Sequence, residues 1–290
     1  MTAQFDPIIG RYVPLEIGGR SCRIYFEEAG SGTPLICLHT AGSDSRQWRG
    51  LLNDPDVTAK HRVIAFDLPW HGKSSPPVGW NLQEPDYVLT ADFYMEAVLA
   101  VSAALELDRP LVVGCSIGGR VVLHLALNHP EKFGGVIGLQ SGAHVDPYYD
   151  LEWLNRPDVD GGMVCAGIVS GLVGPEAPDS DRWETLWHYM QSGPGVFKGD
   201  LHFYRQGGDI QDTVSQIDTD ACPVFLMSGE YDYSATPADT RWVADMIGTN
   251  EITIMSGLGH FPMSENPSRF LEYFRPVLER ADQARAGHAD

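Results

Sequence analysis

The sequence predicts an α/β fold, in which helices flank a mostly parallel central sheet and a helical cap is inserted. Three observations lead to this prediction. Short apolar segments alternate with longer amphipathic ones along most of the chain. This alternation lapses for about seventy residues after Asp146 and then resumes. A glycine-flanked serine, Ser116, stands between a strand-like segment and a helix-like one.

The elements of the core follow one another along the chain. Residues 13–17 and 22–27, joined at Gly18-Gly19, predict an opening hairpin. Further strands are expected at the apolar segments 35–38, 62–66, 111–113, 135–139, 223–227 and 252–255. Helices are expected at residues 91–105, directly after Ser116, and at residues 267–279.

The domain organisation follows from the same alternation. Residues 1–145 and 219–290 form the predicted core, and residues 146–218 form the predicted helical cap. The cap is rich in aromatic side chains. These side chains either make the cap's own small core or line an apolar pocket over Ser116.

Composition narrows the class of partner. The net charge of -19 argues against a nucleic acid or an anionic membrane, because both are polyanions. The five cysteines have neither metal nor redox spacing, which favours a reducing, cytoplasmic setting. We expect no signal peptide, no membrane span, no metal and no cofactor. The expected partner is a small-molecule substrate, and the sequence leaves homo-oligomer formation open.

The serine motif has the local context of a nucleophile. Residues 114–118 read Gly-Cys-Ser-Ile-Gly, with the apolar residues 111–113 before them and an apolar-periodic run after them. Strand, sharp turn and helix in this order make a nucleophile elbow, whose strained backbone projects the serine hydroxyl above the sheet. The glycines let neighbouring elements approach the turn closely. Ser116 is therefore the predicted nucleophile.

The candidate base and acid come from loops late in the chain. A serine hydroxyl needs a base to remove its proton and a third group to orient that base. His260 follows the apolar segment 252–255 in a glycine-rich loop, where open sheets place reactive groups. Asp232 follows the segment 223–227 and is the predicted acid, with Asp146 as the alternative. The order Ser116, Asp232, His260 is the order expected with such an elbow.

Backbone amides are expected to meet the negative oxygen of a tetrahedral intermediate. One donor should be Ile117, the residue after the nucleophile. The other should come from the loop after an early strand, residues 38–43, where the amide of Ala41 is the candidate.

These motifs together resemble the α/β-hydrolase superfamily, specifically its capped single-domain members. Five motifs are the basis of this resemblance. They begin at residues 38, 67, 114, 229 and 259 and read Leu-His-Thr-Ala-Gly, Asp-Leu-Pro-Trp-His-Gly-Lys-Ser, Gly-Cys-Ser-Ile-Gly-Gly, Gly-Glu-Tyr-Asp and Gly-His-Phe-Pro. The resemblance covers nearly the whole chain outside its termini and is weakest in the cap. It implies a hydrolase fold and hydrolase chemistry, and it leaves the substrate open.

Two positions depart from the family's usual pattern. Thr40 stands where the family usually has glycine, and it adds a hydroxyl near the expected oxyanion. Hydroxynitrile lyases of the family also have threonine there, but they place a lysine beside the catalytic histidine, where this chain has Phe261. Trp70 replaces a common glycine, and it either packs under the cap or narrows the mouth of the pocket.

The sequence thus predicts a cofactor-independent serine hydrolase of a carboxylic ester or lactone, with a small to medium apolar or aromatic substrate. The same triad leaves open a C–C bond hydrolase of ring-cleavage dienoates and an amidase. A non-catalytic ligand receptor on this fold is the alternative of a different class. The expected substrate pocket contains Thr40, Trp70, Trp153, Trp187 and Phe261.

Overall fold

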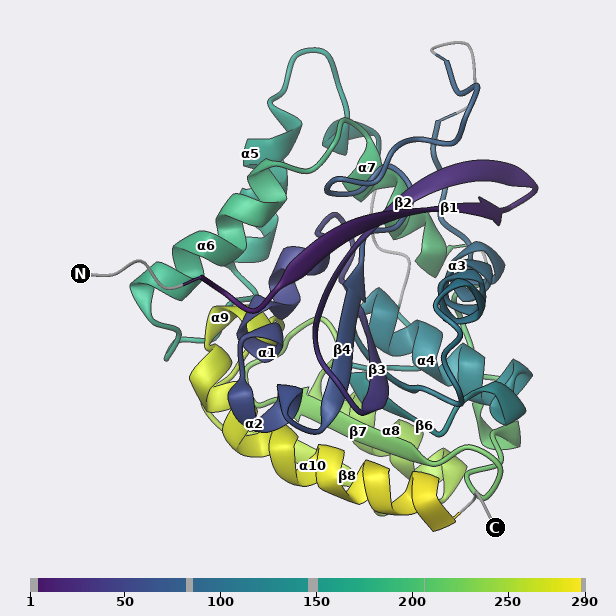
Figure 1. Cartoon of the computed structure of the whole chain (residues 1–290). Helices are drawn as coiled ribbons and strands as arrows, with labels where there is room; N and C mark the ends of the chain where they lie inside the picture. The colour runs from purple at the N-terminus through teal and green to yellow at the C-terminus, as the bar shows by residue number, and fades with distance from the viewer. Residues whose placement is uncertain (1–4, 82–85, 146–150, 206, 288–290) are drawn as a thin grey trace.

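The structure is a computed structural model, and it describes residues 5–81, 86–145, 151–205 and 207–287. In these residues an eight-stranded sheet has the strand order β1-β2-β4-β3-β5-β6-β7-β8 (Figure 1). The strands are β1 (Ile9–Ile17), β2 (Arg20–Gly30), β3 (Thr33–Leu38), β4 (His61–Phe66), β5 (Leu111–Cys115), β6 (Gly135–Leu139), β7 (Val224–Gly229) and β8 (Ile252–Met255). The sheet confirms the predicted α/β fold class.

Strand direction decides which loops meet. β1 and β2 form an antiparallel hairpin and β2 pairs antiparallel with β4, whereas the pairs from β4 through β3 to β8 are parallel. In β3, Ile36 lies opposite Ile64 of β4 and Val112 of β5. Because parallel strands end at one edge of a sheet, the loops after β3, β5, β7 and β8 gather at that edge.

Helices cover both faces of the sheet. The α-helices of the described residues are α1 (Arg49–Leu52), α2 (Pro55–Thr58), α3 (Ala91–Ala104), α4 (Ile117–Asn128), α5 (Gly161–Ser170), α6 (Asp179–Met190), α7 (Val196–Leu201), α8 (Pro237–Ile247), α9 (Pro262–Glu265) and α10 (Pro267–Gly287). Short 3₁₀ helices are η1 (Ser45–Trp48), η2 (Pro130–Lys132), η3 (Glu152–Leu154), η4 (His202–Tyr204) and η5 (Val214–Gln216). In Figure 1, α1, α2 and α10 lie on one side of the sheet, and α3 and α4 lie on the other.

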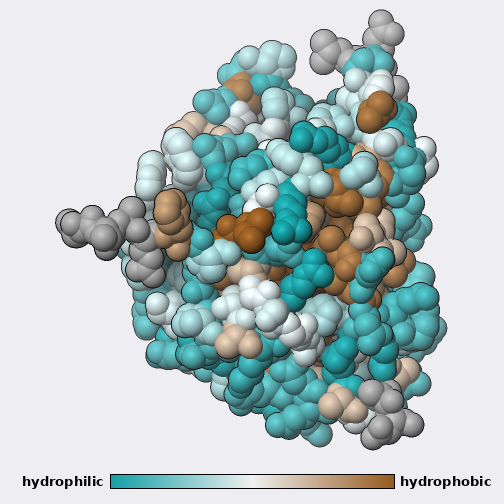
Figure 2. Space-filling model, viewed as in Figure 1, coloured by the Kyte–Doolittle hydropathy of each residue, from teal (hydrophilic) through white to brown (hydrophobic). Residues whose placement is uncertain are grey.

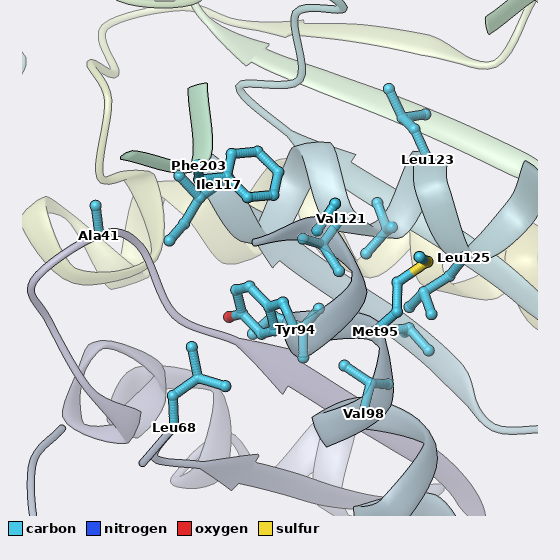
Figure 3. Close-up of a cluster of buried hydrophobic side chains, with 14 of the residues drawn as sticks. Ala41, Leu68, Tyr94, Met95, Val98, Ile117, Val121, Leu123, Leu125 and Phe203 are labelled. Atoms are coloured by element: carbon cyan, nitrogen blue, oxygen red, sulfur yellow. The ribbon is translucent and has the colours of Figure 1, made fainter. Parts of the chain in front are cut away.

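Alternate residues of a strand enter different cores. Ile36 of β3 belongs to the cluster that α3 and α4 cover, and Figure 3 shows Tyr94, Val98 and Val121 meeting in it. Leu35, the preceding residue, belongs to the cluster on the other face of the sheet. Each large side chain that is fully buried in this way contributes about 1.5–3 kcal/mol. These two cores fix the sheet on which the catalytic loops stand.

The connection between β6 and β7 is helical. Its described part contains α5, α6 and α7 and no strand, and α6 packs against α9 of the core. We call residues 151–205 and 207–218 the helical connection. The expected boundary at residue 146 lies outside the described residues, so the division into core and cap stays a prediction.

Most of the molecular surface in view in Figure 2 is hydrophilic, with smaller hydrophobic patches between the hydrophilic residues. No helix of the described residues is both long enough and apolar enough to cross a membrane. All five cysteines are free and buried.

Candidate active site

Ser116 stands at a strained turn between β5 and α4. Its backbone has φ 60° and ψ -116°, a conformation that non-glycine residues rarely adopt. The turn is held from both sides, because the Ser116 amide donates to the Leu139 carbonyl at 3.0 Å and the Arg120 amide donates to the Ser116 carbonyl at 2.8 Å. This is the backbone geometry that the sequence predicts for a nucleophile elbow.

The glycines around Ser116 are required by close packing. A Cβ atom on Gly114 would lie 2.3 Å from the Gly118 carbonyl oxygen. A Cβ atom on Gly119 would lie 2.3 Å from the Leu139 carbonyl oxygen. Neither distance is sterically acceptable, so β5, β6 and α4 approach each other only because these side chains are absent.

His260 and Asp232 meet at the same edge of the sheet. His260 Nδ1 lies 2.9 Å from both carboxylate oxygens of Asp232, and both side chains are buried. The Asp232 carboxylate also accepts the amides of Ser234 at 2.8 Å and Ala235 at 3.3 Å. With Nδ1 donating to Asp232, the neutral imidazole carries its lone pair on Nε2. His260 is thereby oriented to act as a base through Nε2.

One cavity joins Ser116 and His260. Its volume is about 120 Å³, and both residues line it. The Ser116 hydroxyl lies 3.4 Å from the Tyr204 hydroxyl, which reaches it from the helical connection. Most of the lining is apolar and includes Leu151, Leu154, Ile168, Val169, Leu172, Phe197 and Leu201. The site therefore offers an apolar surface next to a serine and an oriented imidazole.

The loop after β3 has a fixed backbone. His39 Nε2 accepts the Leu68 amide at 3.2 Å, so Nδ1 carries the proton and donates to the Thr40 carbonyl at 2.9 Å. Burial, followed by the nearby His71, lowers the pKa of His39 to about 4. Since the carbonyl and the next amide of a trans peptide point in opposite directions, the Ala41 amide points away from His39. Ala41 also lines the cavity.

The second expected amide belongs to the start of a helix. Ile117 is the first residue of α4, and the first amides of a helix have no acceptor within it. The positive end of the helix dipole lies at the same place, which favours a negative oxygen there. The structure thus places the two predicted oxyanion donors, Ala41 and Ile117, in the loop after β3 and directly after Ser116.

The expected pocket residues divide into two groups. Thr40, Trp153 and Phe261 line the cavity. Trp70 and Trp187 are not among its lining residues, which corrects the expectation for both.

The Trp70 ring has its own partners outside the cavity. Its centroid lies 4.4 Å from that of Tyr87 and 5.2 Å from that of Trp80, so it packs in an aromatic group of the core.

The hydroxyl of Thr40 has hydrogen-bond partners within the protein, because it donates to Gln47 Oε1 at 3.1 Å and bonds to the Tyr189 hydroxyl. Asp146, the alternative acid, lies outside the described residues.

Helical geometry explains why Trp187 was expected in the pocket and Tyr189 was missed. Both lie on α6, and residues two positions apart point in nearly opposite directions. The Trp187 side chain is 46% exposed, whereas Tyr189 is 1% exposed and lines the cavity. Thr185, one helical turn before Tyr189, is also buried, and this spacing in the sequence was the available signal.

Further lining residues were not predicted. Tyr204, Ser234 and the exposed Arg205 line the cavity. Tyr204 and Arg205 come from a short 3₁₀ turn whose side-chain directions have no periodic signal in the sequence. Among the described residues, no group of three or more His, Cys, Asp or Glu is arranged to hold a metal ion.

A buried carboxylate fixes the loop that carries His260. Glu265 is fully buried, and its oxygens accept the amides of Gly259, Phe261 at 3.2 Å and Gly174 at 3.2 Å. Burial raises the pKa of Glu265 although these amides oppose the rise. Gly174 belongs to the helical connection, and the His260 amide also donates to Leu172 there at 2.9 Å. The loop is therefore tied to both α9 and the connection.

Comparisons with known proteins identify the family of the chain. Residues 33–158 match the family model described as alpha/beta hydrolase fold. The chain is 32% identical over 289 residues to the 2-hydroxymuconate semialdehyde hydrolase of Pseudomonas sp. (strain CF600), covering 97% of this chain and 98% of that protein. The chain belongs to the α/β-hydrolase family, and it is a hydrolase.

Solved structures share the fold. A thermophilic esterase from Thermogutta terrifontis superposes with a TM-score of 0.79 at 18% identity, covering 93% of this chain and 99% of that one. Est816, an N-acyl homoserine lactone degrading enzyme, superposes with a TM-score of 0.71 at 26% identity, covering 91% and 99%. The first similarity shows the fold alone.

Proposed function

We propose that the protein is a serine hydrolase of carboxylic esters, lactones included, with a small to medium apolar or aromatic substrate. One observation carries the proposal. Ser116 and His260 share one apolar cavity, and Nδ1 of His260 lies 2.9 Å from the buried Asp232. This arrangement activates a serine toward a carbonyl carbon.

The reaction proceeds through an acyl-enzyme. His260 Nε2 takes the proton of the Ser116 hydroxyl as its oxygen attacks the carbonyl carbon, and Asp232 stabilises the imidazolium. The amides of Ala41 and Ile117 stabilise the oxyanion. His260 then protonates the leaving oxygen, the acyl-enzyme remains, and water activated by His260 releases the acid.

The cavity supports an apolar acyl group. The lining of the cavity is dominated by aliphatic and aromatic side chains, which suit an apolar acyl group. The neighbour Est816 is described as degrading an N-acyl lactone, which supports the inclusion of lactones.

A C–C bond hydrolase is the second candidate, and two observations favour it. A relative that matches over almost its whole length is a 2-hydroxymuconate semialdehyde hydrolase. Arg205 lines the cavity, and a guanidinium there suits the carboxylate of a dienoate. The ester remains the first proposal because the cavity is otherwise mostly apolar.

A substrate panel tests both candidates. The panel contains p-nitrophenyl esters of increasing acyl length, an N-acyl homoserine lactone, a p-nitroanilide and a coloured 2-hydroxy-6-oxo-dienoate. We expect turnover of the short esters, and a loss of about 10⁴-fold or more in kcat in Ser116→Ala. Ser234→Ala is the matched control, since Ser234 lines the same cavity and uses only its backbone amide to hold Asp232.

Four results would decide against the ester proposal. Undiminished turnover in Ser116→Ala would remove the serine mechanism. Turnover of the dienoate with inert esters would favour the C–C hydrolase, and turnover of the p-nitroanilide with inert esters would favour an amidase. A fluorophosphonate probe that leaves Ser116 unmodified would favour a binding protein on this fold.

A further inference from the structure

A carboxylate from the helical connection holds the backbone of the loop after β3. Asp200, near the end of α7, is fully buried. One of its oxygens accepts the Gly42 amide at 2.6 Å and His71 Nε2 at 2.8 Å. Its other oxygen accepts the Tyr87 hydroxyl at 2.8 Å. Three donors from the core therefore converge on one side chain of the connection.

The contacts of His71 make this group an ion pair. His71 Nδ1 lies 2.9 Å from the Pro69 carbonyl oxygen, which can only accept a hydrogen bond. His71 Nε2 faces the Asp200 carboxylate, which also accepts. Both ring nitrogens therefore donate, and the imidazole is the cation. An ion pair that is fully buried holds its two partners strongly, because either charge alone would be costly there.

Gly42 links this ion pair to the proposed oxyanion donor. Gly42 follows Ala41, whose amide is the proposed oxyanion donor. The peptide plane before Ala41 is fixed by the bond from His39 Nδ1 to the Thr40 carbonyl, and the plane after it is fixed by the bond from Gly42 to Asp200. Gly42 has φ 69°, which glycine adopts without a steric penalty, and within the loop this turn is closed by the Ser43 amide, which donates to the Thr40 carbonyl at 3.3 Å, so the bond to Asp200 is a second hold on this plane.

We propose that Asp200 is a positioning residue, which holds the loop after β3 so that the Ala41 amide faces the cavity. Because Asp200 lies on α7, this orientation depends on how α7 packs against the core. This inference rests on the proposed function, since it takes the Ala41 amide as an oxyanion donor. Asp200 touches neither Ser116 nor the cavity, and it acts through Gly42 and His71.

Asp200→Asn tests the proposal with little change in shape. Removing one oxyanion donor typically costs roughly 10²–10³ in kcat. The oxygen that asparagine keeps can still face Gly42 and His71, but the charge that strengthens both bonds is lost, so we expect kcat to fall about 10–100-fold with KM changed less than about threefold. Tyr87→Phe is the matched control, because it removes one bond to Asp200 and leaves the bonds to Gly42 and His71. We expect its kcat to stay within about threefold of wild type.

Hydrogen exchange gives a readout that needs no activity. Deuterium uptake of the peptide that spans residues 38–48 should rise in Asp200→Asn and stay at the wild-type level in Tyr87→Phe, because only the first change removes the negative charge that strengthens the bond to the Gly42 amide and pairs with His71. If Asp200→Asn does not fold, His71→Gln replaces it. This variant removes the positive charge and keeps a donor toward Asp200, and we expect the same fall in kcat at constant KM.

The outcomes separate this inference from the proposed function. A wild-type protein that hydrolyses no ester contradicts the proposed function, and the exchange difference then tests the hold on Gly42 alone. An active wild type with unchanged kcat and unchanged exchange in Asp200→Asn overturns the inference. A fall in Tm with kcat and KM unchanged overturns it as well, since Asp200 would then act on stability only.

Discussion

Glu265→Gln would test how much the buried carboxylate contributes to the loop that carries His260. One oxygen of Glu265 accepts the Gly259 amide, and the other accepts the amides of Gly174 and Phe261. Glutamine has one oxygen and one NH₂ group, so its NH₂ must face at least one of these amides. The better orientation keeps the two bonds to Gly174 and Phe261 and leaves the Gly259 amide without an acceptor.

The magnitude follows from this count. A buried donor left without an acceptor costs about 1–3 kcal/mol, and the bonds that remain lose the assistance of a charge, about 0.5–1 kcal/mol each. We expect the free energy of unfolding to fall by about 2–5 kcal/mol, which corresponds to a fall in Tm of about 4–20 °C. Because the freed amide lies directly before His260, we also expect kcat to fall about tenfold or more.

Chemical denaturation and thermal unfolding, measured beside kcat on the best ester of the panel, check these values. Glu230→Gln is the control, because Glu230 is exposed and accepts from the Ser256 hydroxyl at 2.8 Å and the Gly257 amide at 3.0 Å in the same loop. Its effect should stay within about 0.5 kcal/mol. Equal stability and equal kcat of Glu265→Gln and wild type would refute the reasoning.

Three further predictions concern the elbow, the cavity and pH. Gly119→Ala should lower the free energy of unfolding by about 1–3 kcal/mol or more in urea titrations, since its Cβ would lie 2.3 Å from a carbonyl oxygen of β6. Gly167 of α5 has open space around it, so Gly167→Ala should raise the free energy of unfolding by about 0.5–1 kcal/mol. Tyr204→Phe should lower kcat about 2–10-fold, because its hydroxyl lies 3.4 Å from that of the nucleophile; an unchanged kcat would remove Tyr204 from the reaction. Burial alone would lower the pKa of His71, but the charge and hydrogen bond of Asp200 raise it above its ordinary value. Stability from this pair is therefore complete below about pH 6.5 and is lost as pH rises through the folded-state pKa, and urea titrations of His71→Gln should lack that loss.

The sequence predicted the parts of the molecule that depend on local patterns. The central strands β5 and β6 are buried on both faces, so they appear as continuous apolar segments. Ser116 could be found because a sharp turn between a strand and a helix requires glycines at fixed spacing. His260 and Asp232 could be found because parallel strands end at one edge of the sheet, which gives loop residues a known place.

The pocket could not be predicted in the same way, because its residues depend on how separate elements pack. Trp187 was expected there as one of the aromatic side chains of the cap, and Trp70 because it replaces the family's usual glycine and could narrow the mouth of the pocket. Trp70 instead packs against the rings of Tyr87 and Trp80. On α6, Trp187 faces solvent and Tyr189 faces the cavity. The positions of these side chains depend on tertiary contacts, which no local sequence pattern specifies.

Asp200 and Glu265 together suggest what the helical connection does besides lining the cavity. Each carboxylate joins the connection to one catalytic loop: Asp200 reaches from α7 to Gly42, and Glu265 reaches from α9 to Gly174 of the connection while it holds Gly259. Both are fully buried, so neither can lose its partners without leaving an uncompensated polar group. A displacement of the connection would therefore disturb the loop after β3 and the loop that carries His260 together. We expect the two variants Asp200→Asn and Glu265→Gln to lower kcat by factors that do not multiply in the double variant, because each of them weakens one of the attachments of the same connection to the core.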